Sequence, residues 1–98
     1  MNERFKTIIN SEKPVLVDFY ADWCEPCKMM APILKTVKKD IGKVRVLKVN
    51  VDHNPLIAHS YGIHSLPTVM LFKKGEARWM GVGIQSACDI KEIVSNHL

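Results

Sequence analysis

The chain has 98 residues, of which 47% are hydrophobic and 24% charged, a composition typical of a globular protein. This length is usual for one domain, so we expect residues 1–98 to fold as a single unit. The Val, Ile and Leu content argues against disorder, and no apolar run approaches the roughly 18 residues that a membrane span needs. The net charge of +4 comes from scattered basic residues, which argues against nucleic-acid binding.

The chain contains three cysteines and begins without the apolar segment of a secretory signal. Both features favour a reducing compartment, so we expect a cytoplasmic protein. There, the close pair Cys24 and Cys27 indicates redox chemistry or metal binding rather than a structural crosslink. Cys88 stands apart, and we expect a partly buried thiol without a role, with a regulatory thiol as the alternative.

The first half of the chain predicts a helix, a strand and a longer helix. Apolar residues over 5–9 recur at helical spacing after Asn2, a residue type that caps helices. Residues 15–20 predict a buried strand because both faces are apolar, with Asp18 as the exception. The longer helix runs to about residue 40. Its apolar stripe consists of Cys27, Met30, Leu34, Val37 and Ile41.

The second half predicts strands over 44–51, 68–72 and 77–80. Between the first two we expect a short helix that is capped by Asn54, begins at Pro55 and ends near residues 61–62. A helix capped by Ser86 and Asp89 ends the chain. Its apolar face comprises Ile90, Ile93, Val94 and Leu98. Strands separated by helices are expected to pair in parallel, and the last two strands to form a hairpin. The pattern therefore predicts an α/β fold, with a mixed sheet covered by helices on both faces.

The strongest chemical signal lies where the buried strand gives way to the long helix, in Trp23-Cys24-Glu25-Pro26-Cys27-Lys28. A helix N-terminus has unpaired N–H groups and partial positive charge, which stabilise a thiolate. We expect Cys24, before the helix proper, to be the exposed attacking thiol. Cys27 lies in the first turn on the apolar stripe, so we expect it to be shielded and to act second.

Two other interpretations of the cysteine pair are a zinc half-site and an inert structural disulfide. Zinc needs four ligands, and the remaining candidates are His53, His59, His64 and Cys88. The separation between the cysteine pair and His59 is much longer than zinc-finger spacing. A reducing compartment disfavours the structural disulfide.

Motifs along nearly the whole chain from Val15 onward stand in the order and spacing of one known family. They are Val15-Leu16-Val17-Asp18-Phe19, Trp23-Cys24-x-Pro26-Cys27-Lys28, Asp52-x-Asn54-Pro55, Tyr61-Gly62-Ile63, Leu66-Pro67-Thr68 and Lys73-x-Gly75. In these motifs the chain resembles the thioredoxin family. The resemblance implies a thioredoxin-like fold and a protein-disulfide reductase without a bound cofactor or metal. It also implies disulfide-containing substrate proteins and a thioredoxin reductase that draws on NADPH.

The resemblance also implies roles for individual residues. Asp18 would be a buried carboxylate that accepts a proton from Cys27 through water, with Lys48 close to it. Substrate proteins would contact a surface around a cis Pro67. That surface comprises Trp23, Pro26, Leu66, Pro67 and Gly83.

The chain departs from the family pattern at several positions. Glu25 replaces the usual glycine, and its charge should disfavour a Cys24 thiolate and make the protein more reducing than its Glu25→Gly variant. Tyr20 and Ser65 replace a frequent Trp and a frequent Gly, and Ser65 and His64 lie beside the Pro67 groove. Only a short segment precedes residue 15, so we expect four strands, without the first strand of the family.

The strand over 44–51 would then lie at a sheet edge, where pairing with a second copy would give a dimer; we expect a monomer. Two rival functions keep the same fold. One is a thiol oxidant or isomerase, which a high reduction potential would indicate. The other is a non-catalytic interaction module, against which Cys24, Cys27, Asp18 and Pro67 argue.

Overall fold

A computed structural model describes residues 3–98, so Asn2 and its expected capping role lie outside the described residues. The elements follow the predicted order. They are α1 (Glu3–Ile9), β1 (Val15–Tyr20), α2 (Glu25–Ile41), β2 (Arg45–Asn50), α3 (Pro55–Ser60), β3 (Thr68–Lys73), β4 (Glu76–Val82) and α4 (Ala87–Ser95). Within this range no helix is long and apolar enough to cross a membrane.

The four strands form one mixed sheet in the order β2-β1-β3-β4. The expected parallel unit is present for β1 and β2, and β3 and β4 form the expected hairpin. The parallel pairing expected across α3 was wrong, because β3 pairs antiparallel with β1 instead. A connection between two parallel strands must carry the chain back over the full length of a strand, so that the second strand starts at the same end of the sheet as the first. With six residues, α3 spans only about 9 Å, roughly half the length of the strands.

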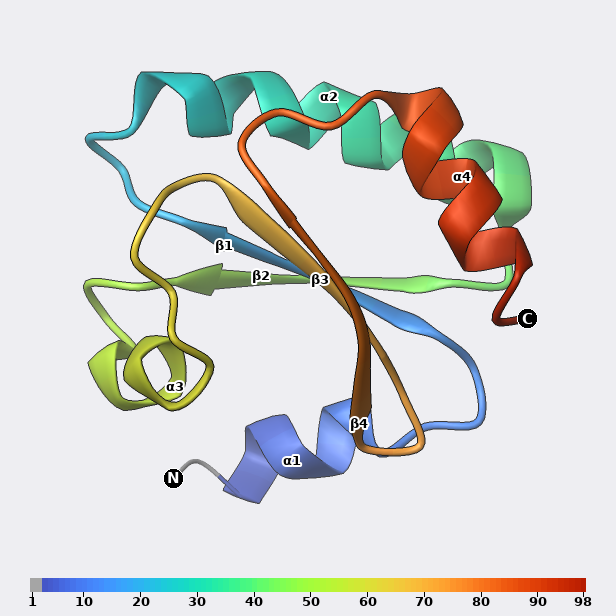
Figure 1. Cartoon of the computed structure of the whole chain (residues 1–98), viewed down its shortest axis with the longest axis horizontal. Helices are drawn as coiled ribbons and strands as arrows, with labels where there is room; N and C mark the ends of the chain where they lie inside the picture. Colours follow the sequence, from blue (N-terminus) through green and yellow to red (C-terminus); the bar gives the residue numbers. More distant parts are fainter. Residues whose placement is uncertain (1–2) are drawn as a thin grey trace.

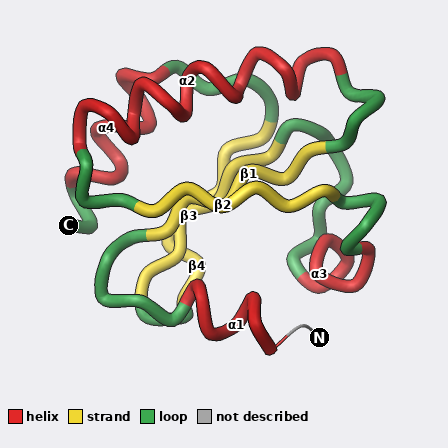
Figure 2. Tube along the Cα trace, turned by 180° about the vertical axis from the view of Figure 1, so that it is seen from behind, coloured by secondary structure: helices red, strands yellow, loops and turns green. Residues whose placement is uncertain are grey.

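The helices cover both faces of the sheet, with α2 and α4 on one side and α1 and α3 on the other (Figures 1 and 2). Alternate side chains of β1 enter the two cores, which is why the strand is apolar on both faces. Leu16 packs with Met30, Leu34 and Ile90 on the first side. Val15, Val17 and Phe19 pack with Phe5 and Ile57 on the second.

Details at the ends of elements differ from the prediction. Asn54 occupies the N-cap position of α3, but its side-chain amide donates to the Asn50 carbonyl at 3.0 Å instead of capping the helix. Leu98 lies beyond the end of α4 and is 56% exposed, so its assignment to the apolar face was wrong. The strand predicted over 77–80 is longer at both ends. The helix α2 ends at Gly42, whose φ of 75° lies in the region that favours glycine.

Replacing the cap of α4 should weaken the fold by a modest amount. The Ser86 hydroxyl accepts a hydrogen bond from the Asp89 backbone N–H at 3.1 Å. We expect Ser86→Ala to lower the free energy of unfolding by about 1 kcal/mol, because that N–H loses its partner. Urea denaturation measures the change. Ser95→Ala, an exposed control at the other end of α4, should change it far less, and equal effects would contradict the capping role.

Candidate active site

The two sulfurs of the Cys-x-x-Cys motif are joined at the start of α2. Cys24 is the N-cap in extended conformation, and Cys27 lies in the first turn with a Cα–Cα distance of 5.4 Å between them. The Cys27 backbone N–H donates to the Cys24 Sγ at 3.3 Å. An N-terminal N–H of a helix therefore points at Cys24, where it would stabilise a thiolate.

Both cysteines are buried, at 4% exposure for Cys24 and 5% for Cys27. The expectation that Cys24 is exposed was therefore wrong for the disulfide form. The reason is local packing, since the disulfide lies on Ala21 and is flanked by Val51 and Leu66. In this form the two sulfurs are equally buried, and they differ in that Cys24 Sγ accepts a backbone hydrogen bond.

The residues expected to contact substrates surround the disulfide. Trp23 is 69% exposed and its indole N–H donates to Asp52 at 2.8 Å, which fixes the ring beside the dithiol. The Leu66–Pro67 peptide bond is cis, as expected. Pro26 is exposed in the first turn of α2. These side chains come from three separate loops or helix ends, which the fold brings to one edge of the sheet.

Gly83 joins the end of β4 to this edge. Its backbone N–H donates to the Pro67 carbonyl at 2.8 Å, and its φ of 86° lies in the region that favours glycine. Val82 and Ile84 on either side expose apolar side chains. The sequence prediction missed both, because a lone apolar residue beside a turn glycine has no distinctive spacing.

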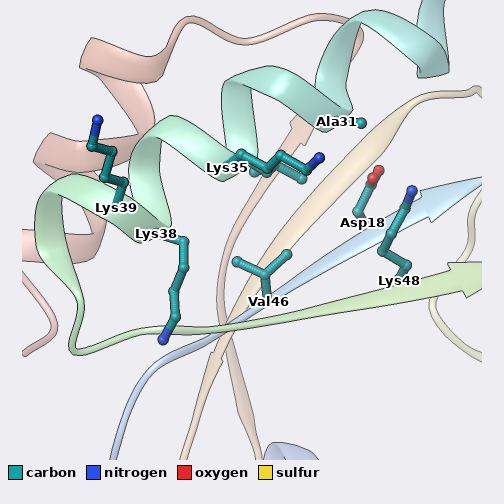
Figure 3. Close-up of a pocket in the computed structure, with 8 residues that line it drawn as sticks. Asp18, Ala31, Lys35, Lys38, Lys39, Val46 and Lys48 are labelled. Atoms are coloured by element: carbon teal, nitrogen blue, oxygen red, sulfur yellow. The ribbon is translucent and has the colours of Figure 1, made fainter.

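Asp18 lies beneath the dithiol on β1 and is only 1% exposed. Within the described residues, neither carboxylate oxygen has a hydrogen-bond partner. Desolvation by burial raises the pKa of Asp18 to about 6, while the charge of Lys48 acts in the opposite direction. Figure 3 shows the Lys48 ammonium group directed toward the Asp18 carboxylate. Lys48 also lies 4.9 Å from the centre of the Tyr20 ring, a contact that the sequence did not reveal.

A pocket of about 270 Å3 connects this carboxylate with the second cysteine, because Asp18, Cys27 and Lys48 all line it. The pocket is wide enough for water, which is the route the sequence predicts for proton transfer. Glu25 is exposed in the first turn of α2 and forms an ion pair of 2.8 Å with Lys28, which lines this pocket. Lys28 therefore offsets part of the negative charge that Glu25 brings to the dithiol.

Other sequence candidates lie elsewhere. The Cys88 thiol is exposed, so the expectation of a partly buried side chain was wrong. His64 and Ser65 are exposed next to Pro67, and the Ser65 carbonyl accepts from the Thr68 hydroxyl at 2.6 Å. Among residues 3–98, no group of three or more His, Cys, Asp or Glu side chains could hold a metal ion.

A disulfide at a helix N-terminus, a buried carboxylate beneath it and a cis proline beside it define a dithiol–disulfide oxidoreductase of thioredoxin-like fold. Comparisons with known proteins agree. The Thioredoxin family model matches residues 1–96. The chain is 48% identical to a thioredoxin of Rickettsia bellii, over 93% of this chain and 88% of the relative. It is 44% identical to thioredoxin 1 of a Nostoc species, over 93% of this chain and 86% of the relative.

Solved structures give the same result. A single-site mutant of a thioredoxin from Halobacterium salinarum superimposes with a TM-score of 0.90 and 33% identity, covering 99% of this chain and 85% of that one. Oxidized mitochondrial thioredoxin 3 from Saccharomyces cerevisiae superimposes with a TM-score of 0.86 and 31% identity, covering 95% of this chain and 87% of that one. The chain belongs to the thioredoxin family. It is a thiol–disulfide oxidoreductase that reduces protein disulfides through its Cys-Glu-Pro-Cys motif.

Removing the Asp18 carboxylate should change how stability depends on pH. The pKa of Asp18 is raised from 3.8 to about 6 on folding, so the cost of burying its charge is absent below about pH 4 and complete above about pH 6. We compare the free energy of unfolding of Asp18→Asn with that of the natural protein. We expect this difference to shift in favour of the variant by about 2–3 kcal/mol when the pH rises from about 4 to about 7.5. Urea denaturation at both pH values measures this gain.

Asp22→Asn provides the control, because Asp22 is an exposed carboxylate close to the same site. Its stability should follow the pH dependence of the natural protein. If Asp18→Asn follows that dependence too, Asp18 does not carry the cost of a buried charge.

Proposed function

We propose that Cys24 is the attacking sulfur of this disulfide reductase and that Cys27 completes the reaction. The observation that carries the assignment is the hydrogen bond of 3.3 Å from the Cys27 N–H to the Cys24 Sγ. That donor stabilises negative charge on Cys24 and on no other sulfur of the site. The exposed Trp23 ring, Pro26, the Leu66–Pro67 segment and the loop at Gly83 would hold the substrate.

The reaction has two exchange steps. The Cys24 thiolate attacks one sulfur of a substrate disulfide; a mixed disulfide forms, and the other substrate sulfur leaves and takes up a proton. Asp18 then accepts the proton of the Cys27 thiol through water in their shared pocket. The Cys27 thiolate attacks the Cys24 sulfur of the mixed disulfide, the second substrate sulfur leaves as a thiolate and takes up a proton, and two electrons have passed to the substrate.

Asp18 suits the role of base because its pKa of about 6 leaves it mostly ionised at neutral pH and still basic enough to accept a proton. Lys48 would act as a positioning residue that limits the rise in this pKa through its charge. The orphaned carboxylate oxygens support this role, because a structural Asp would be expected to have hydrogen-bond partners.

The wider setting belongs to the same proposal. We propose one domain over residues 1–98, active as a monomer in the cytoplasm. A thioredoxin reductase would return the disulfide to the dithiol with electrons from NADPH. The similarity to bacterial thioredoxins supports this setting. A thiol oxidant or isomerase of the same fold is the competing function, and the reduction potential of the dithiol separates the two.

Trapping the mixed disulfide tests the two cysteine roles. With insulin, a thioredoxin reductase and NADPH, we expect Cys24→Ser to abolish NADPH oxidation. Cys27→Ala should also fail to turn over, and non-reducing mass spectrometry should find its Cys24 bound to insulin. Cys88→Ser, which changes the exposed third thiol, should retain activity. Accumulation of the mixed disulfide in Cys24→Ser and not in Cys27→Ala would reverse the two roles.

The charge of Glu25 should make the dithiol slightly more reducing. Its removal frees Lys28 and leaves more positive charge near Cys24, so the reduced form gains stability. We expect Glu25→Gly and Glu25→Gln to raise the reduction potential by about 10 mV, the size expected for an exposed charge. Equilibration with glutathione measures the potential. A potential equal to or below that of the natural protein would contradict the effect.

A further inference from the structure

The outer edge of β2 is open within the described part of the chain, because β2 lies at the end of the sheet. The backbone N–H groups of Arg45 and Val51 donate to β1 or its flanking residue, at 3.0 and 2.9 Å. Backbone direction alternates along a strand, so the N–H and C=O groups of Val46 and Lys48 point away from β1. These two residues together offer two donors and two acceptors.

The open segment is short, because side chains occupy the carbonyl groups at both of its ends. The Val44 carbonyl accepts from the Lys38 ammonium at 2.6 Å, and the Asn50 carbonyl accepts from the Asn54 amide at 3.0 Å. A strand that paired here would therefore hydrogen-bond chiefly at Val46 and Lys48.

A pocket lies beside this edge on each face of the sheet. Toward α2, a pocket of about 310 Å3 has an apolar floor that includes Ala31, Leu34 and Val46. Toward α1, a pocket of about 210 Å3 is lined by Phe5 and Leu47, among others. Successive side chains of an added strand point to opposite faces, so two adjacent apolar residues would enter one pocket each.

The rims of both pockets are basic. Arg4 and Arg45 border the pocket toward α1. Toward α2, the Lys35 and Lys48 ammonium groups converge beside Asp18, while Lys39 points away (Figure 3). Asp18, which is buried, is the one acidic residue that lines either pocket in the described chain. A segment that adds to this edge would therefore be favoured by acidic residues beside its apolar pair.

We propose that the open edge of β2 binds an extended acidic segment of a partner protein as an additional strand. Backbone pairing at Val46 and Lys48 would give affinity, and the two pockets and their basic rims would give specificity. A second copy of this chain fits less well, because pairing two β2 edges brings the exposed Arg45 and Lys48 of both copies together. The surface is separate from the proposed substrate-contact residues Trp23, Pro26, Leu66 and Gly83, and it shares Lys48 with the pocket beneath the dithiol.

A peptide titration tests this surface. The probe is the capped hexapeptide Glu-Asp-Leu-Val-Asp-Glu, and its control replaces the four acidic residues by lysine. We expect saturable shifts of the Val46 and Lys48 amide signals in 15N NMR spectra, at up to about 2 mM of the acidic peptide because the interface is small. Equal binding of the lysine peptide, or no shift at these amides, would overturn the proposal.

Matched variants separate charge from pairing. Arg45→Glu should weaken binding roughly fivefold, whereas Arg78→Glu makes the same charge change on the opposite edge strand, β4, and should not. Val46→Pro removes an outward N–H at a position where edge strands tolerate proline. Since proline itself has no amide signal, the expected result is loss of the peptide-induced shift at the Lys48 amide. If this variant does not fold, Arg45→Glu still decides. Sedimentation that shows a dimer dispersed by the peptide would identify a second copy as the natural occupant instead.

Discussion

The hydrogen bond from the Cys27 N–H to the Cys24 sulfur depends on where α2 begins. Cys24 is extended and the helix starts at the following residue, so the first free N–H groups of the helix lie over this sulfur. Met30 and Leu34 anchor the helix on the sheet core, and this packing prevents the N-terminus from shifting away from the end of β1. Core packing far from the dithiol thus sets the electrostatic environment of one sulfur.

The same packing makes it energetically unfavourable for the Asp18 carboxylate to carry a charge. Its strand is covered by α2 on one face, and a carboxylate there loses its hydration without gaining a hydrogen-bond partner. A protein selected for stability alone would place an apolar residue at this point. The raised pKa of Asp18 therefore represents a loss of stability, and in the proposed mechanism it is also the property that makes the group a competent base at neutral pH.

Sequence patterns predicted the elements and the dithiol because their signals are local: the apolar stripe of α2, the apolar run of β1 and the Cys-x-x-Cys spacing. They failed where a contact joins distant segments. The direction of β3 depends on α3 being too short for a crossover. The burial of Cys24 depends on Val51 and Leu66, and the orientation of Trp23 on Asp52. None of these pairings leaves a periodic trace in the sequence.

Lys48 connects the open edge of β2 with the chemistry of the dithiol. Its side chain borders the pocket shared with Cys27 as well as both pockets beside the edge. Its charge lowers the pKa of Asp18 against the effect of burial, while its backbone N–H and C=O face outward. An acidic group bound at the edge would compete for the same ammonium, so less of its field would act on Asp18. Occupation of the edge would consequently raise the pKa of Asp18, the proposed proton acceptor beneath Cys27, and would couple the two surfaces electrostatically through one side chain.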